Sequence, residues 1–306
     1  MIEQFCDVGG GITLCYETFG DRSDPPALLI MGLATQMVAW QEDFCSELAG
    51  RGFYVIRFDN RDSGRSTHLQ GRGPTLPELL LRSKRAARYT LADMADDTAG
   101  LITQLDLAPA HVIGASMGGM IAQTLAIRRP ELVRSLVSIM SNTGSRWNGQ
   151  PSPRIYSAFI RRAPAGREAF IAHAERLFAS IGSRGLPRDV EGIRRIAGES
   201  YDRDPSADGS ERQLAAIQAS PDRTSALRRL DTPTLVIHGT ADPLVSPSGG
   251  RATARAIPGA QLLNIKGMGH DLPRVAWPQL IDAIATHAAG ADARASGARA
   301  AQTVPR

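Results

Sequence analysis

Short apolar runs alternate with longer segments of helical spacing along most of this sequence, and no other feature limits the possible fold as much. The apolar runs span residues 27–31, 53–58, 111–116, 135–140, 234–239 and 260–265, and the helical segments span residues 36–50, 91–106, 119–129, 248–257 and 275–288. Continuous apolar runs are typical of strands that are buried on both faces. Their alternation with helices therefore predicts an α/β fold with a mostly parallel sheet flanked by helices.

Two stretches depart from this alternation. Residues 2–8 and 12–20 flank three consecutive glycines, which predicts an N-terminal β-hairpin. Residues 144–229 contain no clear strand, although they lie between two apolar runs of the sheet. Because ligands of open parallel sheets bind beyond the carboxyl ends of the strands, we predict that this segment is an inserted helical cap over that edge. The core domain would then consist of residues 1–143 and 230–288.

The cap and the last residues carry two further expectations. The aromatic residues of the cap are Trp147, Tyr156, Phe159, Phe170 and Phe178. Their spacing is that of side chains buried in a helical cap, so we expect most of them to pack internally and only a few to touch a substrate. Residues 289–306 contain Ala, Gly, Arg and Ser without periodicity, which predicts a disordered tail.

The composition argues against nucleic-acid binding. The net charge is +4, but nearly all the positive charge is arginine, and the only lysines are Lys84 and Lys266. Charges of both signs are interspersed, so no basic stripe is present. Residues 79–88 are basic and amphipathic, which leaves two interpretations open: association with an anionic membrane surface, or a solvated helix in a loop.

Cysteine spacing and the apolar runs indicate a reduced, soluble protein. Cys6, Cys15 and Cys45 are odd in number and have no CxxC spacing, so neither a disulfide framework nor a zinc site is expected. No secretion signal is recognisable, and no stretch approaches 18 apolar residues, which predicts a cytoplasmic location. No HExxH motif, dinucleotide-binding glycine pattern or His/Cys cluster is found, so we expect no metal and no organic cofactor.

A serine lies between a predicted strand and a predicted helix, in the sequence Gly-Ala-Ser-Met-Gly-Gly of residues 114–119. This strand–turn–helix setting is that of a nucleophile elbow, in which the turn strains the backbone of Ser116 and small flanking residues prevent Cβ collisions. The helix starting at Met117 would direct N–H groups toward developing negative charge. We predict that Ser116 is a nucleophile; the alternative is a glycine-rich turn with an incidental serine.

A serine hydroxyl needs a base to accept its proton, and the base needs a carboxylate to orient it. His270 is the candidate base, because it lies in a glycine-rich loop directly after the last predicted strand. His111 and His238 lie within apolar strands and are expected to be core residues. The other histidines lie in a loop (His68), in the cap (His173) and at the end of the last helix (His287).

Asp242 is the candidate acid. It follows the predicted strand 234–239 and precedes a proline, which suits a tight turn at the carboxyl end of that strand. The competing interpretation is that Asp242 only caps the next helix. The other position where an acid could stand, after strand 135–140, carries Ser141 and Asn142 instead. The order Ser, Asp, His along the chain is the one expected for a nucleophile elbow of this kind.

An oxyanion formed at Ser116 would need two N–H donors. One is expected from Met117, the residue after the nucleophile, and the other from the loop after strand 27–31. In that loop Gly32 permits a tight turn, so we predict that Leu33 N–H is the second donor, with Gly32 or Ala34 as the alternatives. Gly32, Leu33 and Met117 are accordingly the predicted substrate-binding residues.

Five motifs in order resemble the α/β-hydrolase superfamily: IMG at residues 30–32, FDNRDSGRST at 58–67, GASMGG at 114–119, HGTADPLV at 238–245 and GMGHDLP at 267–273. Within it, the chain is similar to bacterial esterases that include the aclacinomycin methylesterases and mycobacterial lipase/esterase-like proteins. The resemblance covers residues 1–143 and 230–288 well and the cap poorly. It implies an α/β-hydrolase fold and a serine hydrolase that acts on a small lipophilic ester.

The resemblance also has one departure and one structural implication. Many relatives have His-Gly where this chain has Met31-Gly32, so the backbone donor is retained but an imidazole is missing. The resemblance further implies that Asp59, Arg61 and Asp62 brace the sheet edge by hydrogen bonds rather than take part in catalysis.

Several functions remain compatible with these residues. Ester hydrolysis through an acyl-enzyme at Ser116 is favoured, on a methyl ester or a short-to-medium acyl chain. The same residues would also serve a lactonase, a thioesterase, a carbon–carbon bond hydrolase or a cofactor-free perhydrolase (haloperoxidase-like), since such specificity resides in the pocket. Haloalkane dehalogenase and epoxide hydrolase are disfavoured, because both need a carboxylate at the elbow. A non-catalytic ligand receptor is the remaining class. The sequence leaves the physiological substrate and the oligomeric state open.

Overall fold

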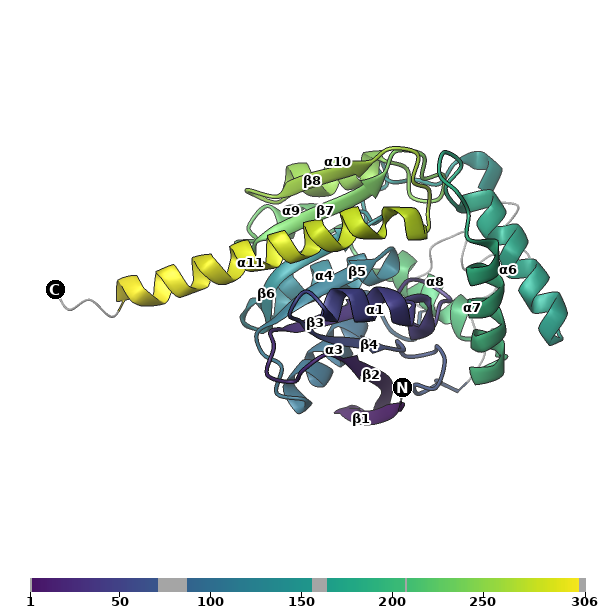
Figure 1. Cartoon of the computed structure of the whole chain (residues 1–306), viewed down its shortest axis with the longest axis horizontal. Helices are drawn as coiled ribbons and strands as arrows, with labels where there is room; N and C mark the ends of the chain where they lie inside the picture. Colours follow the sequence, from purple (N-terminus) through teal and green to yellow (C-terminus); the bar gives the residue numbers. More distant parts are fainter. Residues whose placement is uncertain (1, 71–86, 156–163, 207, 303–306) are drawn as a thin grey trace.

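An eight-stranded, mostly parallel sheet forms the centre of the protein (Figure 1). The computed structural model describes residues 2–70, 87–155, 164–206 and 208–302. In the order in which they lie in the sheet, the strands are β1 (Gln4–Gly9), β2 (Ile12–Phe19), β4 (Tyr54–Phe58), β3 (Pro26–Ile30), β5 (Ala110–Ala115), β6 (Val133–Ile139), β7 (Thr234–Gly239) and β8 (Gln261–Ile265). The β1–β2 and β2–β4 pairs are antiparallel and every later pair is parallel.

Helices cover both faces of this sheet, because successive strand residues point to opposite sides. In β3, Leu28 and Ile30 pack with α3 (Leu91–Gln104) and α4 (Met117–Arg128). Ala27 and Leu29 pack on the other side, with α1 (Glu42–Ala49) and α11 (Trp277–Gln302). The remaining helical elements of the core are α10 (Ser248–Ala256) and the 3-10 turns η1 (Met37–Ala39), η2 (Pro130–Leu132) and η4 (Arg274–Ala276). The predicted alternation of strands and helices is confirmed.

The single helix predicted over residues 36–50 is wrong, because the chain forms η1 and α1 with a break at Trp40. At this break the Trp40 carbonyl accepts a hydrogen bond from the buried guanidinium of Arg57. Arg57 also pairs with Glu17, through an Nε–Oε2 distance of 2.8 Å. The partner of the Trp40 carbonyl therefore lies on a strand, which local helical spacing does not reveal.

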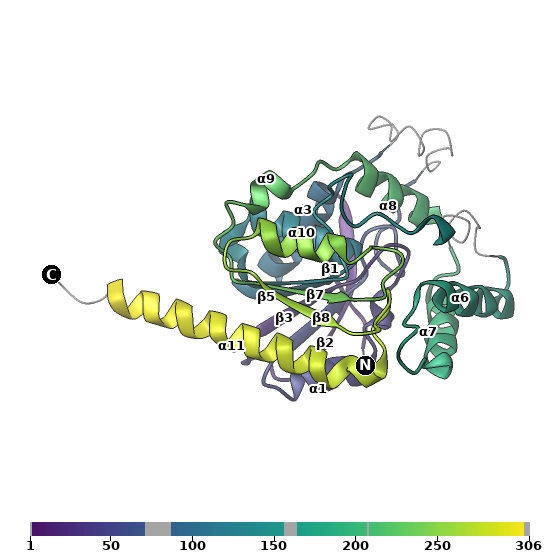
Figure 2. The same ribbon diagram turned by 90° about the horizontal axis from the view of Figure 1, so that it is seen from above.

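The segment between β6 and β7 contains the turn η3 (Pro153–Ile155) and the helices α6 (Arg167–Ile181), α7 (Val190–Arg203), α8 (Asp208–Ala219) and α9 (Thr224–Leu227). Figures 1 and 2 show α6 and α7 beside the sheet, at the end of the molecule away from the C-terminus. The expectation that the aromatic side chains here pack internally is wrong for Trp147, which is 90% exposed. Phe170 and Phe178 are half-buried, and the Phe170 ring packs on Tyr201 with 5.6 Å between ring centroids. The basic segment 79–88 lies almost entirely outside the described residues.

Buried ion pairs fasten this inserted segment to the loop after β4. Arg203 of α7 donates from Nη2 to Asp59 Oδ2 at 2.7 Å, and Arg212 of α8 donates from Nη2 to Asp62 Oδ1 at 2.7 Å. Breaking a buried pair by removing one partner costs about 3–5 kcal/mol, because the other charge stays buried without compensation. Asp59 and Asp62 thus join the inserted helices to the sheet, whereas Arg61 pairs with Asp97 of α3.

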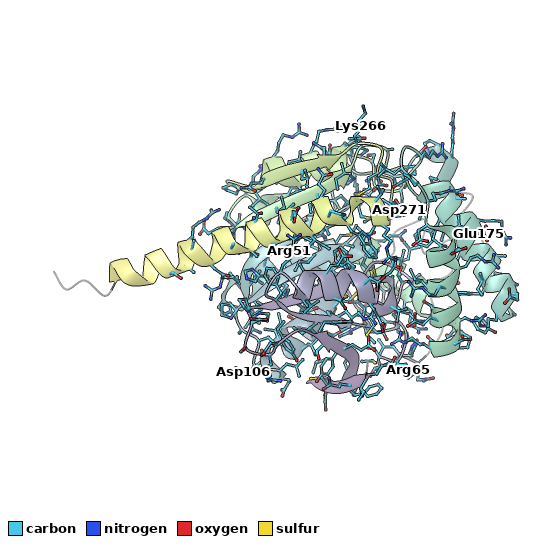
Figure 3. The ribbon with its side chains drawn as sticks, in the orientation of Figure 1. Arg51, Arg65, Asp106, Glu175, Lys266 and Asp271 are labelled. Atoms are coloured by element: carbon cyan, nitrogen blue, oxygen red, sulfur yellow. The ribbon has the colours of Figure 1, made fainter. Side chains whose placement is uncertain are left out.

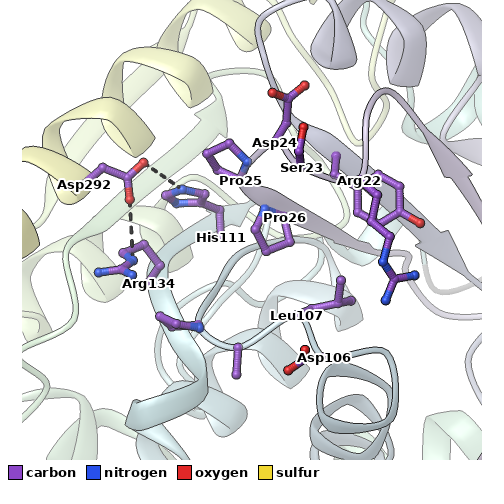
Figure 4. Close-up of a pocket in the computed structure, with 13 residues that line it drawn as sticks. Arg22, Ser23, Asp24, Pro25, Pro26, Asp106, Leu107, His111, Arg134 and Asp292 are labelled. Atoms are coloured by element: carbon purple, nitrogen blue, oxygen red, sulfur yellow. Dashed lines mark ion pairs between the residues drawn. The ribbon is translucent and has the colours of Figure 1, made fainter.

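The predicted disordered tail at 289–306 is wrong for residues 289–302, which continue α11 without a break. Alanine has the highest helix propensity, and Ala291 in this stretch of α11 is buried, as is Ala288 directly before it. Asp292 adds an ion pair with Arg134 at 3.5 Å and a polar contact with the His111 imidazole at 3.3 Å (Figure 4). These residues border a cavity of about 350 Å³ at the amino-terminal ends of β3 and β5.

All three cysteines are free thiols inside the protein. Burial raises the pKa of the Cys15 and Cys45 thiols to about 12 and raises the pKa of Cys6 as well. Among the described helices, none is long and apolar enough to cross a membrane.

Acidification below pH 6.5 is expected to lower the stability of the fold through its buried histidines. Burial lowers the pKa of His111, His238 and His287, so the unfolded chain binds more protons than the folded one as the pH falls from about 7 to about 5. The free energy of unfolding should decrease over that window. His68 acts in the opposite direction, because its hydrogen bond to Asp204 raises its pKa.

Urea unfolding of wild type and His287→Gln at pH 7.5 and pH 5.5 measures this contribution. The glutamine variant removes one of the titrating groups, so its loss of unfolding free energy between the two pH values should be smaller than that of wild type. Equal losses in both proteins would show that His287 does not take part.

Candidate active site

Ser116 lies at the carboxyl end of β5 in a strained turn, with φ 56° and ψ −118°. The turn requires glycine at two nearby positions. A Cβ on Gly114 would lie 2.1 Å from the Gly118 carbonyl oxygen, and a Cβ on Gly118 would lie 2.1 Å from the Ile30 carbonyl oxygen. The Ser116 N–H donates to the Ile139 carbonyl at 2.9 Å. Backbone packing therefore fixes the serine at the edge of the sheet, directly before α4.

The structure brings Ser116, His270 and Asp242 into one hydrogen-bonded row. His270 Nε2 lies 2.9 Å from Ser116 Oγ, and His270 Nδ1 lies 2.8 Å from Asp242 Oδ2. An ionised carboxylate can only accept, so Nδ1 carries the proton and Nε2 is free to accept from the serine hydroxyl. The side chain of Asp242 is fully buried and that of His270 is only 8% exposed. This arrangement can take a proton from Ser116 and hold the resulting imidazolium next to a negative charge.

The Asp242 carboxylate is held by the loop that follows it. Its Oδ1 accepts N–H bonds from Leu244 and Val245, both at 2.9 Å. His238 is fully buried beside it: Nε2 lies 2.8 Å from the Val245 carbonyl and 3.6 Å from Asp242 Oδ2. Burial lowers the pKa of His238, which favours a neutral imidazole that donates to Val245. The sequence predicted a core residue here, and the structure adds its contact with the loop that carries Asp242.

The loop that contains the predicted second oxyanion donor lies against the serine. Gly32 packs directly on it, since a Cβ there would lie 3.1 Å from Ser116 Cβ and 3.6 Å from Ser116 Oγ. Within the part of the chain that the structure describes, neither Leu33 N–H nor Met117 N–H has a hydrogen-bond partner. The Ala34 N–H, one of the alternatives, instead donates to Gln213 Oε1 of α8 at 2.9 Å. Leu33 and Met117 therefore remain available to a ligand.

Sequence reasoning missed residues of the inserted segment that contact this site. Gln213 holds both Ala34 and the Arg61 carbonyl, and Ser183 contacts the loop of His270. Neither residue lies in a recognisable sequence motif, because each forms hydrogen bonds to a loop that is distant in the sequence. Among the described residues, no group of three His, Cys, Asp or Glu side chains could hold a metal ion.

A mostly parallel sheet that is flanked by helices and carries a serine turn at the end of a central strand defines a protein of the α/β-hydrolase type. A family model described as alpha/beta hydrolase fold matches residues 25–273, and the chain belongs to this family. The predicted fold class is thus confirmed, as is the predicted similarity to bacterial methylesterases, which the following relatives document.

Three known proteins resemble the chain in sequence or in fold. The chain is 28% identical over 295 residues to rhodomycin D methylesterase DauP of Streptomyces sp. (strain C5), covering 90% of this chain and 95% of that protein. It is 31% identical over 265 residues to a Mycobacterium tuberculosis protein with the provisional name non-heme bromoperoxidase BpoC, covering 85% and 91%. The structure of esterase RhEst1 from Rhodococcus sp. ECU1013 matches with a TM-score of 0.74 and 20% identity, over 94% of this chain and 99% of that one.

Proposed function

We propose that this protein is a carboxylic ester hydrolase that works through an acyl-enzyme on Ser116. The observation that carries this proposal is the buried hydrogen-bonded row from Ser116 through His270 to Asp242. As the Ser116 oxygen bonds to the ester carbonyl carbon, its proton passes to His270 Nε2. Asp242 keeps Nδ1 protonated and stabilises the imidazolium. The carbonyl oxygen becomes an oxyanion, which the N–H groups of Leu33 and Met117 bind.

The protonated His270 then completes acylation, and deacylation by water follows. The imidazolium gives its proton to the leaving alcohol oxygen as the carbon–oxygen bond breaks, which leaves Ser116 acylated. A water molecule then attacks the acyl carbon while His270 accepts its proton. The carboxylic acid leaves and the proton returns to Ser116. No metal or organic cofactor enters either half-reaction.

A small lipophilic ester is the substrate class that we propose. The loop beside Ser116 contributes Leu33, an apolar side chain that is only partly buried against the core. The relative DauP is named a methylesterase, which favours a methyl ester among such substrates. The inserted segment would then act as a cap over the site, and we expect it to set the preference for the acyl part.

Initial rates on p-nitrophenyl esters from acetate to palmitate, together with labelling by a fluorophosphonate probe, test this proposal. We expect covalent labelling at Ser116 and turnover that peaks at one acyl-chain length, because the acyl pocket has a fixed depth. Labelling without turnover of any ester would favour a non-catalytic receptor, and absence of both would overturn the proposal.

Perhydrolysis is a second candidate, which the provisional name of the Mycobacterium tuberculosis relative favours. In that reaction hydrogen peroxide, in place of water, attacks the acyl group on Ser116 and a peracid leaves. Peracid formation from acetate and hydrogen peroxide measures it. A peracid rate that exceeds the best ester rate would assign the perhydrolase, and the reverse order would assign the esterase.

A further inference from the structure

The loop that carries His270 is bonded to the inserted segment as well as to the sheet. The His270 N–H donates to the carbonyl of Ile181, the last residue of α6, at 2.8 Å. The preceding amide, Gly269 N–H, donates to Ser183 Oγ at 2.9 Å. Two consecutive peptide groups at the histidine thus depend on a segment that lies more than 80 residues earlier.

Ser183 also binds the residue that follows the histidine. Asp271 Oδ1 accepts both the Ser183 hydroxyl at 2.6 Å and the Ser183 N–H at 3.0 Å. The hydroxyl has one proton, which it gives to Asp271, while its oxygen accepts from Gly269. Ser183 is 1% exposed, so water cannot replace these bonds without a rearrangement of the loop.

Glycines let the two loops approach closely. A Cβ on Gly269 would lie 2.3 Å from the Gly182 carbonyl carbon, and a Cβ on Gly185 would lie 3.0 Å from Gly267 Cα. Figure 3 shows Asp271 where the loop after β8 meets the ends of α6 and α7. The backbones are therefore in direct contact on either side of the hydrogen bonds made by Ser183.

We propose that Ser183 and Asp271 are positioning residues for His270, so that the inserted segment sets the orientation of the general base. This inference rests on the proposed function. Ser183 connects Gly269 to Asp271 and so fixes the backbone on both sides of the histidine. Proton transfer from Ser116 depends on the position of the imidazole, and small displacements of a catalytic group can cost up to about 10²-fold in rate.

Steady-state kinetics of Ser183→Ala, Asp271→Ala and the double variant test the proposal. Each single variant should lower kcat by about 10- to 100-fold and change KM by less than about twofold, because neither side chain touches the ester. The double variant should be no slower than the slower single one, because both substitutions break the same connection. Asp271→Asn keeps an acceptor oxygen for Ser183 and should retain most of the activity.

Ser180→Ala is the matched control, since the one hydrogen bond that the Ser180 hydroxyl makes to the described residues stays within α6, at the Arg176 carbonyl, and this variant should behave as wild type. Unchanged kcat in Ser183→Ala, or losses that multiply in the double variant, would overturn the proposal. A second readout needs no turnover: the low-field proton resonance of His270 Nδ1–H, which should be sharp in wild type and broadened in Ser183→Ala. If wild type hydrolyses no ester, the proposed function fails, and an unchanged resonance in Ser183→Ala would separately overturn the positioning role.

Discussion

Replacing Ser116 with alanine is expected to lower kcat for ester hydrolysis by about 10⁴- to 10⁶-fold. The substitution removes the oxygen that would form the acyl-enzyme, and His270 then has no hydroxyl to deprotonate. Residual turnover would come from water held near the oxyanion donors. The fold should persist, because alanine keeps the Cβ that the turn already accommodates and because the Ser116 N–H still bonds to Ile139. Initial rates on the best p-nitrophenyl ester measure the effect.

Ser141→Ala is a suitable control for this variant. Ser141 is buried beside the elbow, and within the described part of the chain its hydroxyl has no hydrogen-bond partner. We expect this variant to be labelled by the fluorophosphonate and to turn over at the wild-type rate. A Ser116→Ala enzyme that keeps more than about a tenth of the wild-type kcat would rule out Ser116 as the nucleophile.

Asp242→Asn should lower kcat by about 10⁴-fold while leaving the fold almost unchanged. Oδ1 of residue 242 accepts two backbone N–H groups, so the amide oxygen of asparagine would stay there. The amide nitrogen then replaces Oδ2 and presents N–H to His270 Nδ1. The imidazole must accept at Nδ1 and carry its proton on Nε2, which leaves it unable to take the proton of Ser116. Single-turnover rates with an activated ester measure the loss.

The tautomer of His270 in this variant can be measured separately from the rate. In Asp242→Asn the low-field resonance of His270 Nδ1–H should disappear, because that nitrogen has become an acceptor. A loss of less than tenfold in Asp242→Asn would instead support the interpretation of Asp242 as a helix cap.

The parts of the fold that were predictable are those encoded locally. The apolar run before Ser116, together with Gly114 and Gly118, predicts a strand, a tight turn and a helix, and backbone collisions confirm why glycine is required there. His270 and Asp242 were also identifiable, because each follows a predicted strand and the carboxyl ends of parallel strands meet at one edge. Their mutual distances, by contrast, come only from the structure.

What could not be predicted depends on contacts between distant segments. The break at Trp40 follows from Arg57, which lies on a neighbouring strand. In the stretch of α11 that was predicted to be disordered, Asp292 contacts His111 and Arg134, which lie on two strands of the sheet. The inserted segment contains no recognisable motif, so its hydrogen bonds to the loops around Ser116 could not be predicted from the sequence.

The buried cysteines make this protein convenient for site-specific spectroscopy. A thiol reacts with maleimides and similar reagents as the exposed thiolate, and Cys6, Cys15 and Cys45 are all enclosed with raised pKa values. A single cysteine introduced on the solvent side of α6 or α7 would therefore react far faster than the native ones. A fluorophore or spin label placed there would report on movements of the inserted segment during turnover, without prior removal of any native thiol.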